Sequence, residues 1–493
     1  MIQVQKEDEE MKRVTPLIVA EELELKECIG QGACGNVWKG MLRGTVVAVK
    51  ELKSKYENAE QFKREIGIMI RIRHPNVVLF MGACHDPPYI VTEYLEAGDL
   101  LDWIGKNQKL LEKKDQKVPI KEMLQISIDI AKGMAWLHQF KPQPIIHKDL
   151  KPTNIMLDSK GNAKIIDFGL SEVQKQREME NRRFAGSASW MSPEMLLGKS
   201  YTEKIDVYAY GIILWQIFTS STEVYDIRRY QHLSPSAAIQ KFIHDIVDGN
   251  MRPDLNFENL KSNLAIRSII TQAWDSDPHY RPSFKQIIEI LTNTRLSTIL
   301  KDNSAIQFWQ HNFPDKEVVP LEQFYDALWD TLYAKGEAPS PDRGDLLQRC
   351  IEAIIHAPGT KTDTISLERF GNLLHWYGPL QKDNINHRNI LEKILDLLQK
   401  PWFHAEITGH EAEELLNTSG TGENFLIRCS LSPLAPFTIS RLHVSSENQK
   451  SIVHHRINFN PQSSLYTMQY QAKSADIKLI TVKSIEEFIE NAK

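Results

Sequence analysis

The sequence predicts a multidomain α+β protein, and three observations support this fold class. The chain has 493 residues, more than one hydrophobic core usually serves. Near the N-terminus a glycine-rich stretch stands between two strand-like segments, whereas residues 300–400 have the patterns of helices. After residue 401 a helical pattern is followed by several strand-like segments. We therefore expect successive domains with separate cores.

Composition and charge exclude several classes of protein. A net charge of −5 gives no reason to expect nucleic acid as a partner. The five cysteines form no close pairs, so neither a disulfide framework nor a zinc cluster is indicated, and we expect a reducing compartment. No signal peptide, no apolar run long enough for a membrane span and no N-terminal glycine for myristoylation are visible. We expect a cytoplasmic protein.

The stretch from His147 to Asn154, H-K-D-L-K-P-T-N, holds residue types suited to phosphoryl transfer. Such a reaction needs an acceptor hydroxyl held in line and charge that steadies the phosphate oxygens. Asp149 can orient the hydroxyl and take its proton, and Lys151 can reach the transferring phosphate. Asn154 and Asp167 offer the oxygen ligands that Mg²⁺ prefers.

The first 22 residues are charged and aperiodic, so we expect a flexible leader over residues 1–22. Residues 23–29 alternate as a strand does and run into glycines 30, 32 and 35. A dinucleotide-binding unit would continue with a helix, but here residues 37–40 and 45–50 read as two more strands. A hairpin of this kind lets backbone N–H groups approach phosphates.

A helix is expected over residues 59–70, because apolar side chains recur at positions 62, 66, 69 and 70. Glu65 lies just off this stripe and is the best candidate to form an ion pair with Lys50 at the end of the third strand. Strands are expected at residues 77–81 and 89–92, and a buried helix at residues 122–138.

The motif H-x-D-x-x-x-x-N, followed by Asp167-Phe168-Gly169, resembles the catalytic loop and metal motif of protein kinases. Ser192-Pro193-Glu194 is similar to the A-P-E motif of that family, and the preceding Trp190-Met191 resembles its tyrosine-kinase-like branch. The resemblance covers about residues 23–294. It implies the bilobal protein kinase fold, ATP as the phosphoryl donor, and Mg²⁺, with Mn²⁺ as an alternative.

The same resemblance assigns the site residues. It implies that Asp149, Lys151, Lys50 and Glu65 are catalytic and that Asn154 and Asp167 bind the metal. Thr92 corresponds to the gatekeeper and Asp99 to the residue that reaches the ribose. The residues assigned to ATP binding are Ile29, Gly30, Gln31, Gly32, Ala33, Cys34, Gly35, Asn36, Val37, Ala48, Lys50, Thr92, Glu93, Leu95, Asp99 and Leu157.

In the larger lobe the resemblance implies a buried ion pair between Glu194 and Arg281, and it places Asp206 on the helix behind the catalytic loop. The sequence departs from the family pattern at Lys148, where an arginine usually grips a phosphate on the activation segment. Lysine lacks the planar fork, so phosphate control is expected to be looser. Ser187 and Ser189 are the candidate phosphorylation sites of that segment.

Lys151 also bears on the substrate class. Serine/threonine kinases place a lysine two residues after the base, so Lys151 favours transfer to serine and threonine, with tyrosine transfer left open. A pseudokinase scaffold is the alternative function, and the presence of Lys50, Glu65, Asp149, Asn154 and Asp167 argues against it.

Residues 295–400 have the patterns of helices. They contain an internal echo, that is, two segments of similar sequence at residues 319–324 and 365–370. Each copy is a short extended piece that opens a helix, as in an EF-hand. Position 12 of the calcium loop would be Gln323 or Arg369 rather than the required glutamate, so calcium is rejected. An EF-hand-like spacer and an ordinary helical linker both remain open.

Residues 424–430, N-F-L-I-R-C-S, form an apolar strand that contains one arginine, Arg428. An unpaired buried arginine is costly and therefore indicates an anionic ligand. The segment resembles the strand of SH2 domains whose arginine binds phosphotyrosine, which implies that Arg428, Ser430, His454 and Arg456 bind phosphotyrosine. Gly409 stands where many SH2 domains have a second arginine. A generic α+β domain is the alternative.

A kinase followed by an SH2 domain is similar to the amoebal, Dictyostelium-type group of dual-specificity, tyrosine-kinase-like kinases. The expected domains are the leader, the kinase domain, the helical linker and the SH2 domain, at residues 1–22, 23–294, 295–400 and 401–493. The resemblance implies protein substrates and tyrosine-phosphorylated partners, and it leaves peripheral recruitment to a membrane open.

Overall fold

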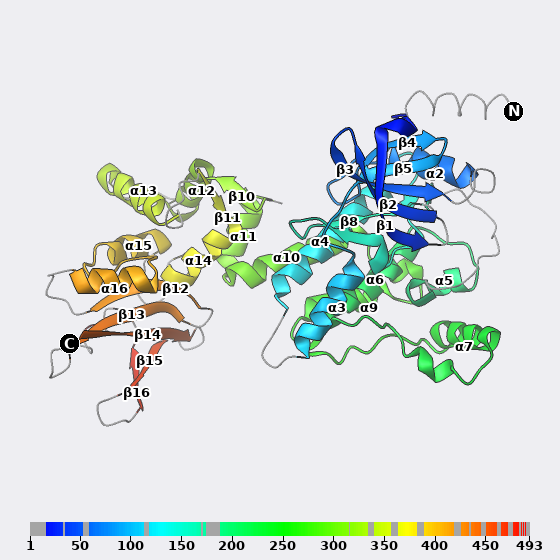
Figure 1. The fold of residues 1–493 in the computed structure, drawn as a ribbon. Coiled ribbons are helices and arrows are strands. Elements are labelled where there is room, and N and C mark those ends of the chain that lie inside the picture. Colours follow the sequence, from blue (N-terminus) through cyan, green and yellow to red (C-terminus); the bar gives the residue numbers. More distant parts are fainter. Residues whose placement is uncertain are drawn as a thin grey trace. The chain divides into compact units, whose positions relative to one another are not determined.

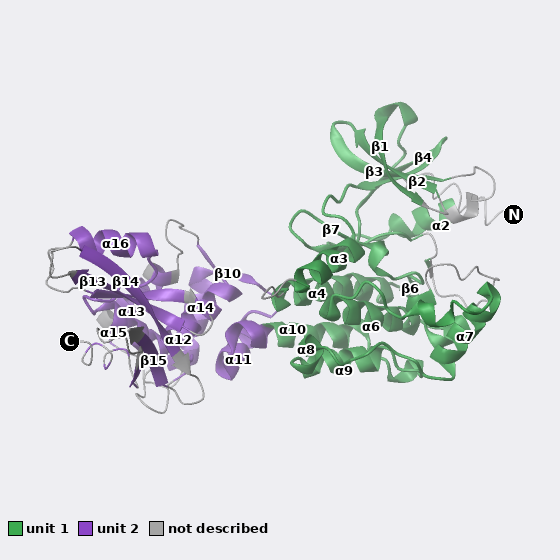
Figure 2. Ribbon diagram, turned by 60° about the horizontal axis from the view of Figure 1, so that its bottom comes forward, with its two compact units in different colours: residues 1–295 green, residues 296–493 purple. Residues whose placement is uncertain are grey.

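The computed structural model describes residues 16–32, 35–52, 59–112, 118–168, 171–173, 188–314, 316–333, 340–355, 363–381, 389–418, 425–432, 435–444, 450–460, 465–471 and 477–482, together with 485, 487 and 489. The chain divides into two compact units, residues 1–295 and residues 296–493 (Figure 2). No helix in the described part of either unit is both long and apolar enough to cross a membrane.

The first unit begins with an antiparallel five-stranded sheet in the order β1-β2-β3-β5-β4 (Figure 1). Its strands are β1 (Leu23–Gly32), β2 (Gly35–Leu42), β3 (Thr45–Leu52), β4 (Phe80–His85) and β5 (Pro88–Glu93). Helix α2 (Ala59–Met69) joins β3 to β4. Gly35 is required at the β1–β2 turn, because a Cβ there, at φ 153°, would lie 1.8 Å from the carbonyl oxygen of Glu51.

The described end of the expected leader is bound to this sheet. The backbone N–H of Ile18 donates to the carbonyl of Ala83 at 3.0 Å, and Ala83 donates to the carbonyl of Pro16 at 3.0 Å. The side chain of Ile18 is buried, and a 3₁₀ turn, η1 (Ala20–Glu22), leads into β1. Residues 16–22 therefore differ from the expected flexible leader, whereas residues 1–15 lie outside the described part.

The apolar run at residues 77–81 does not form one strand. Val77 forms a bridge with Ile165, and the N–H of Val78 donates to the carbonyl of the same residue at 3.0 Å. Strand β4 therefore starts only at Phe80. The residues before it connect the sheet to the larger lobe.

The larger lobe is built mainly of helices packed around α6, whose side chains are buried almost throughout. Its helices are α3 (Leu100–Leu111), α4 (Ile120–His138), α5 (Pro193–Leu196), α6 (Lys204–Thr219), α7 (Pro235–Val247), α8 (Glu258–Lys261), α9 (Leu264–Ala273) and α10 (Phe284–Leu300). Its 3₁₀ turns are η2 (Pro152–Asn154), η3 (Ala188–Trp190), η4 (Ile227–Tyr230) and η5 (Pro278–Tyr280).

Two short strand pairs in this lobe frame the functional loops. β6 (Ile145–Ile146) pairs with β9 (Glu172–Val173), and β7 (Ile155–Leu157) pairs with β8 (Ala163–Ile165). The stretch 147–154 connects β6 to β7, and Asp167 follows β8. The strand pairs thus bring the two motifs together.

The second unit contains helices followed by a second five-stranded sheet. The helices are α11 (Asn303–Asn312), α12 (Leu321–Tyr333), α13 (Pro341–Ile355), α14 (Leu367–Tyr377), α15 (Ile390–Leu398) and α16 (Gly409–Thr418). The antiparallel sheet follows chain order, with strands β12 (Phe425–Ser432), β13 (Ala435–Val444), β14 (Lys450–Asn460), β15 (Leu465–Gln471) and β16 (Ile477–Val482).

The two echoing segments lie side by side in this unit. β10 (Val318–Pro320) pairs antiparallel with β11 (Thr364–Ser366), and Val319 stands opposite Ile365. Each strand runs directly into a helix, α12 or α14. The echo thus corresponds to two equivalent strand–helix segments joined through their strands.

The helices before residue 400 and the sheet after it share one hydrophobic core. This core includes Leu296 and Leu300 at the end of α10, continues through Phe370 of α14, and ends at Ile485 and Ile489. Packing is therefore continuous across the predicted boundary near residue 400.

Candidate active site and phosphate-binding pocket

Lys50 lies between two carboxylates in the first unit. Its ammonium Nζ is 2.7 Å from Oε1 of Glu65 on α2 and 2.8 Å from Oδ1 of Asp167. The predicted ion pair between Lys50 and Glu65 is therefore present. Burial would lower the pKa of Lys50, but the charges of Glu65 and Asp167 outweigh it and raise the pKa above the usual value. The lysine is thus held charged and fixed in place.

Asp149 is held at the tip of the catalytic loop by two neighbours. Its Oδ2 accepts from Nζ of Lys151 at 2.7 Å and from Nδ2 of Asn154 at 3.0 Å. Asn154 also donates to the backbone carbonyl of Asp149 at 2.8 Å. The loop therefore presents a carboxylate, an ammonium and an amide in one small cluster.

Asp206 of α6 fixes the backbone of this loop through hydrogen bonds. Its carboxylate accepts from the backbone N–H groups of His147 and Lys148, both at 2.9 Å, and is 2.9 Å from Nε2 of His138. Burial would raise the pKa of Asp206, but its hydrogen bonds and the nearby histidines outweigh burial and lower it. A charged, fully bonded Asp206 therefore fixes the loop backbone.

Lys148, the departure from the kinase pattern, is buried. Its ammonium lies 5.2 Å from the ring centroid of Tyr201, which follows α5 in the chain. The backbone at Lys148 has φ 69°, in the left-handed region. This side chain thus packs on an aromatic ring of the larger lobe.

The residues predicted to bind a metal fit a hard divalent cation. Asn154 uses its amide nitrogen toward Asp149, which leaves its amide oxygen as a ligand. Asp167 lies just after β8 and precedes Phe168, whose ring is fully buried. The described residues contain no group of three or more His, Cys, Asp or Glu side chains suited to a metal. An amide oxygen and a carboxylate oxygen, supplemented by phosphate oxygens, suit a hard divalent cation.

The predicted nucleotide residues belong to β1, β2, β3, β5 and β7 and to the segment that follows β5. β1 and β2 carry the described residues of the glycine-rich turn, whereas Ala33 and Cys34 lie outside the described part. Ala48 of β3 stands opposite the gatekeeper Thr92 of β5. Leu95 and Leu157 are both buried in the main hydrophobic core of this unit.

Two of the acidic residues predicted to bind ATP have protein partners. Glu93 forms an ion pair with Lys164 at 2.8 Å. Asp99 caps α3, because its Oδ1 accepts from the N–H of Asp102 at 2.8 Å. The predicted contact of Asp99 with the ribose would therefore have to share this carboxylate with the helix cap.

The activation segment ends on a buried ion pair. Nη1 and Nη2 of Arg281 lie 2.5 and 2.9 Å from the two carboxylate oxygens of Glu194. This is the predicted pair, with the bidentate geometry that favours arginine. Ser189 lies half-buried in η3, whereas Ser187 is outside the described residues.

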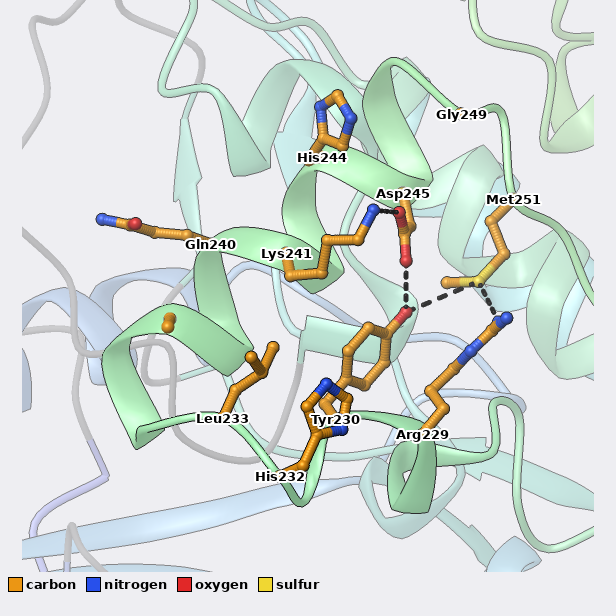
Figure 3. A pocket seen from close by; sticks show the side chains of 11 residues that line it. Arg229, Tyr230, His232, Leu233, Gln240, Lys241, His244, Asp245, Gly249 and Met251 are labelled. Atoms are coloured by element: carbon orange, nitrogen blue, oxygen red, sulfur yellow. Dashed lines mark hydrogen bonds and ion pairs between the residues drawn. The ribbon is translucent and has the colours of Figure 1, made fainter.

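A wide pocket of about 910 Å³ lies elsewhere in the larger lobe, between η4, α7 and the segment that follows α7 (Figure 3). Tyr230 stands at its centre and donates to Asp245 at 2.8 Å. Lys241 also contacts Asp245, at 2.6 Å, so much of the charge is already paired. None of the predicted catalytic residues lines this pocket.

In the second unit the predicted phosphotyrosine residues share one face of the sheet. The strand register places Arg428, Thr438 and Arg456 opposite one another on β12, β13 and β14. The next row on that face contains Ser440 and His454, whose Nδ1 is 2.8 Å from the hydroxyl of Ser440. Three of the four residues predicted to bind phosphotyrosine therefore lie on this face by strand alternation, namely Arg428, His454 and Arg456. Ser430, the fourth, lies where the register between β12 and β13 shifts.

The guanidinium of Arg428 is only partly hydrogen-bonded among the described residues. Its Nη1 donates to the carbonyl of Ile407 at 3.4 Å, and its buried Nε has no hydrogen-bond partner among the described residues. Burial lowers the pKa of the guanidinium below its usual value. Gly409 lies beside it, since a Cβ at that position would be 3.7 Å from Nη2. An anion with several oxygens would satisfy this group.

Sequence reasoning missed several partners of these residues. His138 at the end of α4 contacts Asp206, and Glu413 of α16 lies 3.1 Å from Nε2 of His454. Trp376 of α14 donates from its indole N–H to the carbonyl of Ser430 at 2.8 Å. Their spacing in the sequence carries no signal, because each contact joins elements distant along the chain.

Comparison with known families gives two matches. Residues 23–291 match the family described as protein tyrosine and serine/threonine kinase. Residues 402–481 match the SH2 domain family. The first match covers the unit with Lys50, Asp149 and Asp167, and the second covers the sheet with Arg428.

Relatives with both parts occur in Dictyostelium discoideum. The chain is 32% identical over 470 residues to dual specificity protein kinase shkC, covering 92% of this chain and 88% of that protein. It is 31% identical over 453 residues to dual specificity protein kinase shkA, covering 87% and 81%. A plant relative, serine/threonine-protein kinase CTR1 of Arabidopsis thaliana, is 36% identical over 277 residues, or 55% of this chain and 31% of that protein. With the assembled kinase motifs and the SH2 fold on one chain, the protein belongs to the SH2-domain-containing protein kinases related to shkC and shkA.

Proposed function

We propose that this ATP-dependent protein kinase transfers phosphoryl groups mainly to serine and threonine hydroxyls, and that its SH2 domain binds tyrosine-phosphorylated proteins through Arg428. The claim of phosphoryl transfer rests on two sets of contacts. Lys50 pairs with Glu65 and Asp167, and Asp149 pairs with Lys151. A scaffold without activity would have no need to keep these charges within bonding distance of one another.

Each residue has a definite task in this proposal. Asn154 and Asp167 would hold Mg²⁺, which would supply positive charge to the phosphate oxygens of ATP, the phosphoryl donor. Lys50, kept charged by Glu65, holds the nucleotide phosphates. Asp149 aligns the acceptor hydroxyl and takes its proton, while Lys151 places positive charge beside the developing negative oxygens.

The substrate class rests on Lys151 and on the names of the relatives. Relatives are named dual specificity and serine/threonine kinases, so minor transfer to tyrosine fits the proposal. Lys151 contacts the Oδ2 atom of Asp149 that would take the acceptor's proton. We infer that its ammonium would lie beside the acceptor hydroxyl of a serine or threonine.

Phosphoamino-acid analysis tests this substrate class. After incubation of the full chain with labelled ATP and a mixed protein substrate, we expect phosphoserine and phosphothreonine to carry most of the label. The Asp149→Asn variant, treated in parallel, reports label from contaminating kinases. A product that is mostly phosphotyrosine would contradict the proposed role of Lys151.

Gly409 offers a gain-of-function test of the phosphotyrosine pocket. Gly409→Arg adds a second cation beside Arg428, in a place where a Cβ meets nothing closer than 3.7 Å. A charge-assisted hydrogen bond, offset by repulsion between the two arginines, should strengthen phosphotyrosine-peptide binding by about tenfold. Isothermal titration calorimetry on the full chain measures the change.

The matched control for that test is Gly409→Ala, which adds the Cβ without the charge. We expect its peptide affinity to equal that of the unaltered chain. If Gly409→Arg binds no better than Gly409→Ala, the phosphate does not bind beside Gly409 and Arg428.

A further inference from the structure

Helix α14 contacts the strand that carries Arg428, although it belongs to the helical part of the second unit. The indole N–H of Trp376 donates to the carbonyl of Ser430 at 2.8 Å. Nε2 of the neighbouring His375 lies 3.1 Å from the carbonyl of Ser432. Both carbonyls follow Arg428 on β12, so the end of α14 fixes the end of the strand.

The start of α14 holds the segment on the other side of Arg428. Nη1 of Arg369 lies 2.5 Å from Oε2 of Glu406. Glu406 precedes Ile407, whose carbonyl accepts from Nη1 of Arg428 at 3.4 Å. The guanidinium of Arg369 also packs on the ring of Trp376, 5.1 Å from its centroid. The contacts at the two ends of the helix are therefore linked to each other.

The segment held by Arg369 runs along β12 as an additional backbone neighbour. The N–H of Ile427 donates to the carbonyl of Trp402 at 2.8 Å, and the N–H of Cys429 donates to the carbonyl of Ala405 at 2.7 Å. These bonds flank Arg428 in the sequence. A shift of the segment would therefore move the backbone from which Arg428 projects.

Behind the strand, α14 completes the core. Cys429 points to the face opposite Arg428, and its Sγ lies 3.9 Å from the hydroxyl of Tyr377. Phe403 continues this packing, with its ring centroid 6.3 Å from Tyr377 and 6.0 Å from Phe437 of β13. Helix α14 therefore covers part of this face of the SH2 sheet.

We propose that the helical segment is part of the phosphotyrosine-binding module, with Trp376, His375 and Arg369 of α14 as positioning residues for the Arg428 pocket. This inference rests on the proposed phosphotyrosine-binding function of Arg428. A guanidinium binds a phosphate through two parallel hydrogen bonds. This geometry requires that the strand carrying the arginine be positioned to within a fraction of an ångström. The three contacts supply that restraint from outside the SH2 sheet.

The test compares two tryptophans of the same unit in the full chain. Trp376→Phe removes the N–H that holds Ser430 and keeps most of the ring. The control, Trp309→Phe, removes an equally buried N–H that donates to the carbonyl of Lys316 at 2.9 Å, within the helical part. Binding of a phosphotyrosine peptide and of phenyl phosphate is measured by calorimetry, and melting temperature is measured on the same samples.

We expect Trp376→Phe to bind both ligands about three- to tenfold more weakly than Trp309→Phe, at similar melting temperatures, as one lost hydrogen bond implies. An equal loss for phenyl phosphate shows that the defect lies at the phosphate and not at flanking peptide contacts. If Trp376→Phe does not fold, His375→Leu replaces it, because His375 is only half-buried and its loss leaves the core intact.

The outcomes separate the two claims. If the unaltered chain binds the peptide and Arg428→Ala does not, but the α14 variants bind as well as Trp309→Phe, the positioning role is refuted and the pocket stands. If the unaltered chain binds neither ligand, the phosphotyrosine function fails and this inference fails with it. Weaker binding by the α14 variants alone supports the proposal.

Discussion

Asp149→Asn is expected to lower phosphoryl transfer by about 10²- to 10⁴-fold, the usual contribution of a general base. Asparagine has the same shape but cannot take the proton of the acceptor hydroxyl. It also loses the ion pair with Lys151, which lies 2.7 Å from Oδ2 of Asp149. Nucleotide binding should persist, because Lys50, Glu65 and Asp167 keep their contacts with one another.

Turnover and nucleotide affinity should be measured on the same purified variant. Asp248→Asn is a matched control, since Asp248 is an exposed carboxylate that pairs with His244 at the end of α7. Near-normal turnover in Asp149→Asn would remove Asp149 from the role of the base. Loss of nucleotide binding would instead point to damage of the whole site.

Arg428→Ala should weaken phosphotyrosine-peptide binding by at least ten- to a hundredfold. Each hydrogen bond from a guanidinium to a phosphate contributes about 1.5–3 kcal/mol, and about 1.4 kcal/mol corresponds to a factor of ten. Apart from Ser430 and Arg456, few groups can compensate. Gly409 has no side chain, and His454 is already bonded to Ser440 and close to Glu413.

Two further variants sharpen this second experiment. Arg428→Lys keeps the charge without the fork, so its affinity should lie between those of the unaltered chain and Arg428→Ala. Arg441→Ala is the control, because Arg441 is an exposed arginine of β13 whose side chain alternates to the opposite face from Thr438 and Ser440. Equal affinities of Arg428→Ala and Arg441→Ala would place the ligand elsewhere.

The residues of the active site could be named from the sequence because their chemistry dictates their spacing. Asp149, Lys151 and Asn154 act on one phosphate from one short loop, so they must lie close together in the chain. The pairing of Lys50 with Glu65 was also predictable. Glu65 lies next to the apolar stripe of its helix, so it was expected at the edge of the core, and Lys50 ends the preceding strand. The strand alternation that put His454 and Arg456 on one face follows the same logic.

Contacts between distant segments could not be predicted from local patterns. Ile18 binds beside Ala83 through backbone hydrogen bonds, which any residue could form, so the segment read as a leader. The apolar run at residues 77–79 has the character of a strand, but Val77 bridges to Ile165 of the larger lobe instead of joining the sheet.

The packing of the helical segment against the SH2 domain could not be predicted from local patterns either. Trp376 and Tyr377 stand in an amphipathic helix, and their spacing shows only that they are buried. That they contact Ser430 and Cys429, more than fifty residues later, depends on how two elements pack. The echo at residues 319–324 and 365–370 indicated two equivalent strand–helix segments but not the pairing of Val319 with Ile365.

The central claim is that this chain is a working kinase and not a scaffold with a kinase fold. The most direct measurement is the transfer of label from γ-labelled ATP, with Mg²⁺, to a generic protein substrate by the purified full chain. We predict multiple turnovers by the unaltered chain and almost none by Asp149→Asn in the same assay. A chain that binds ATP yet transfers no more label than Asp149→Asn would contradict the claim.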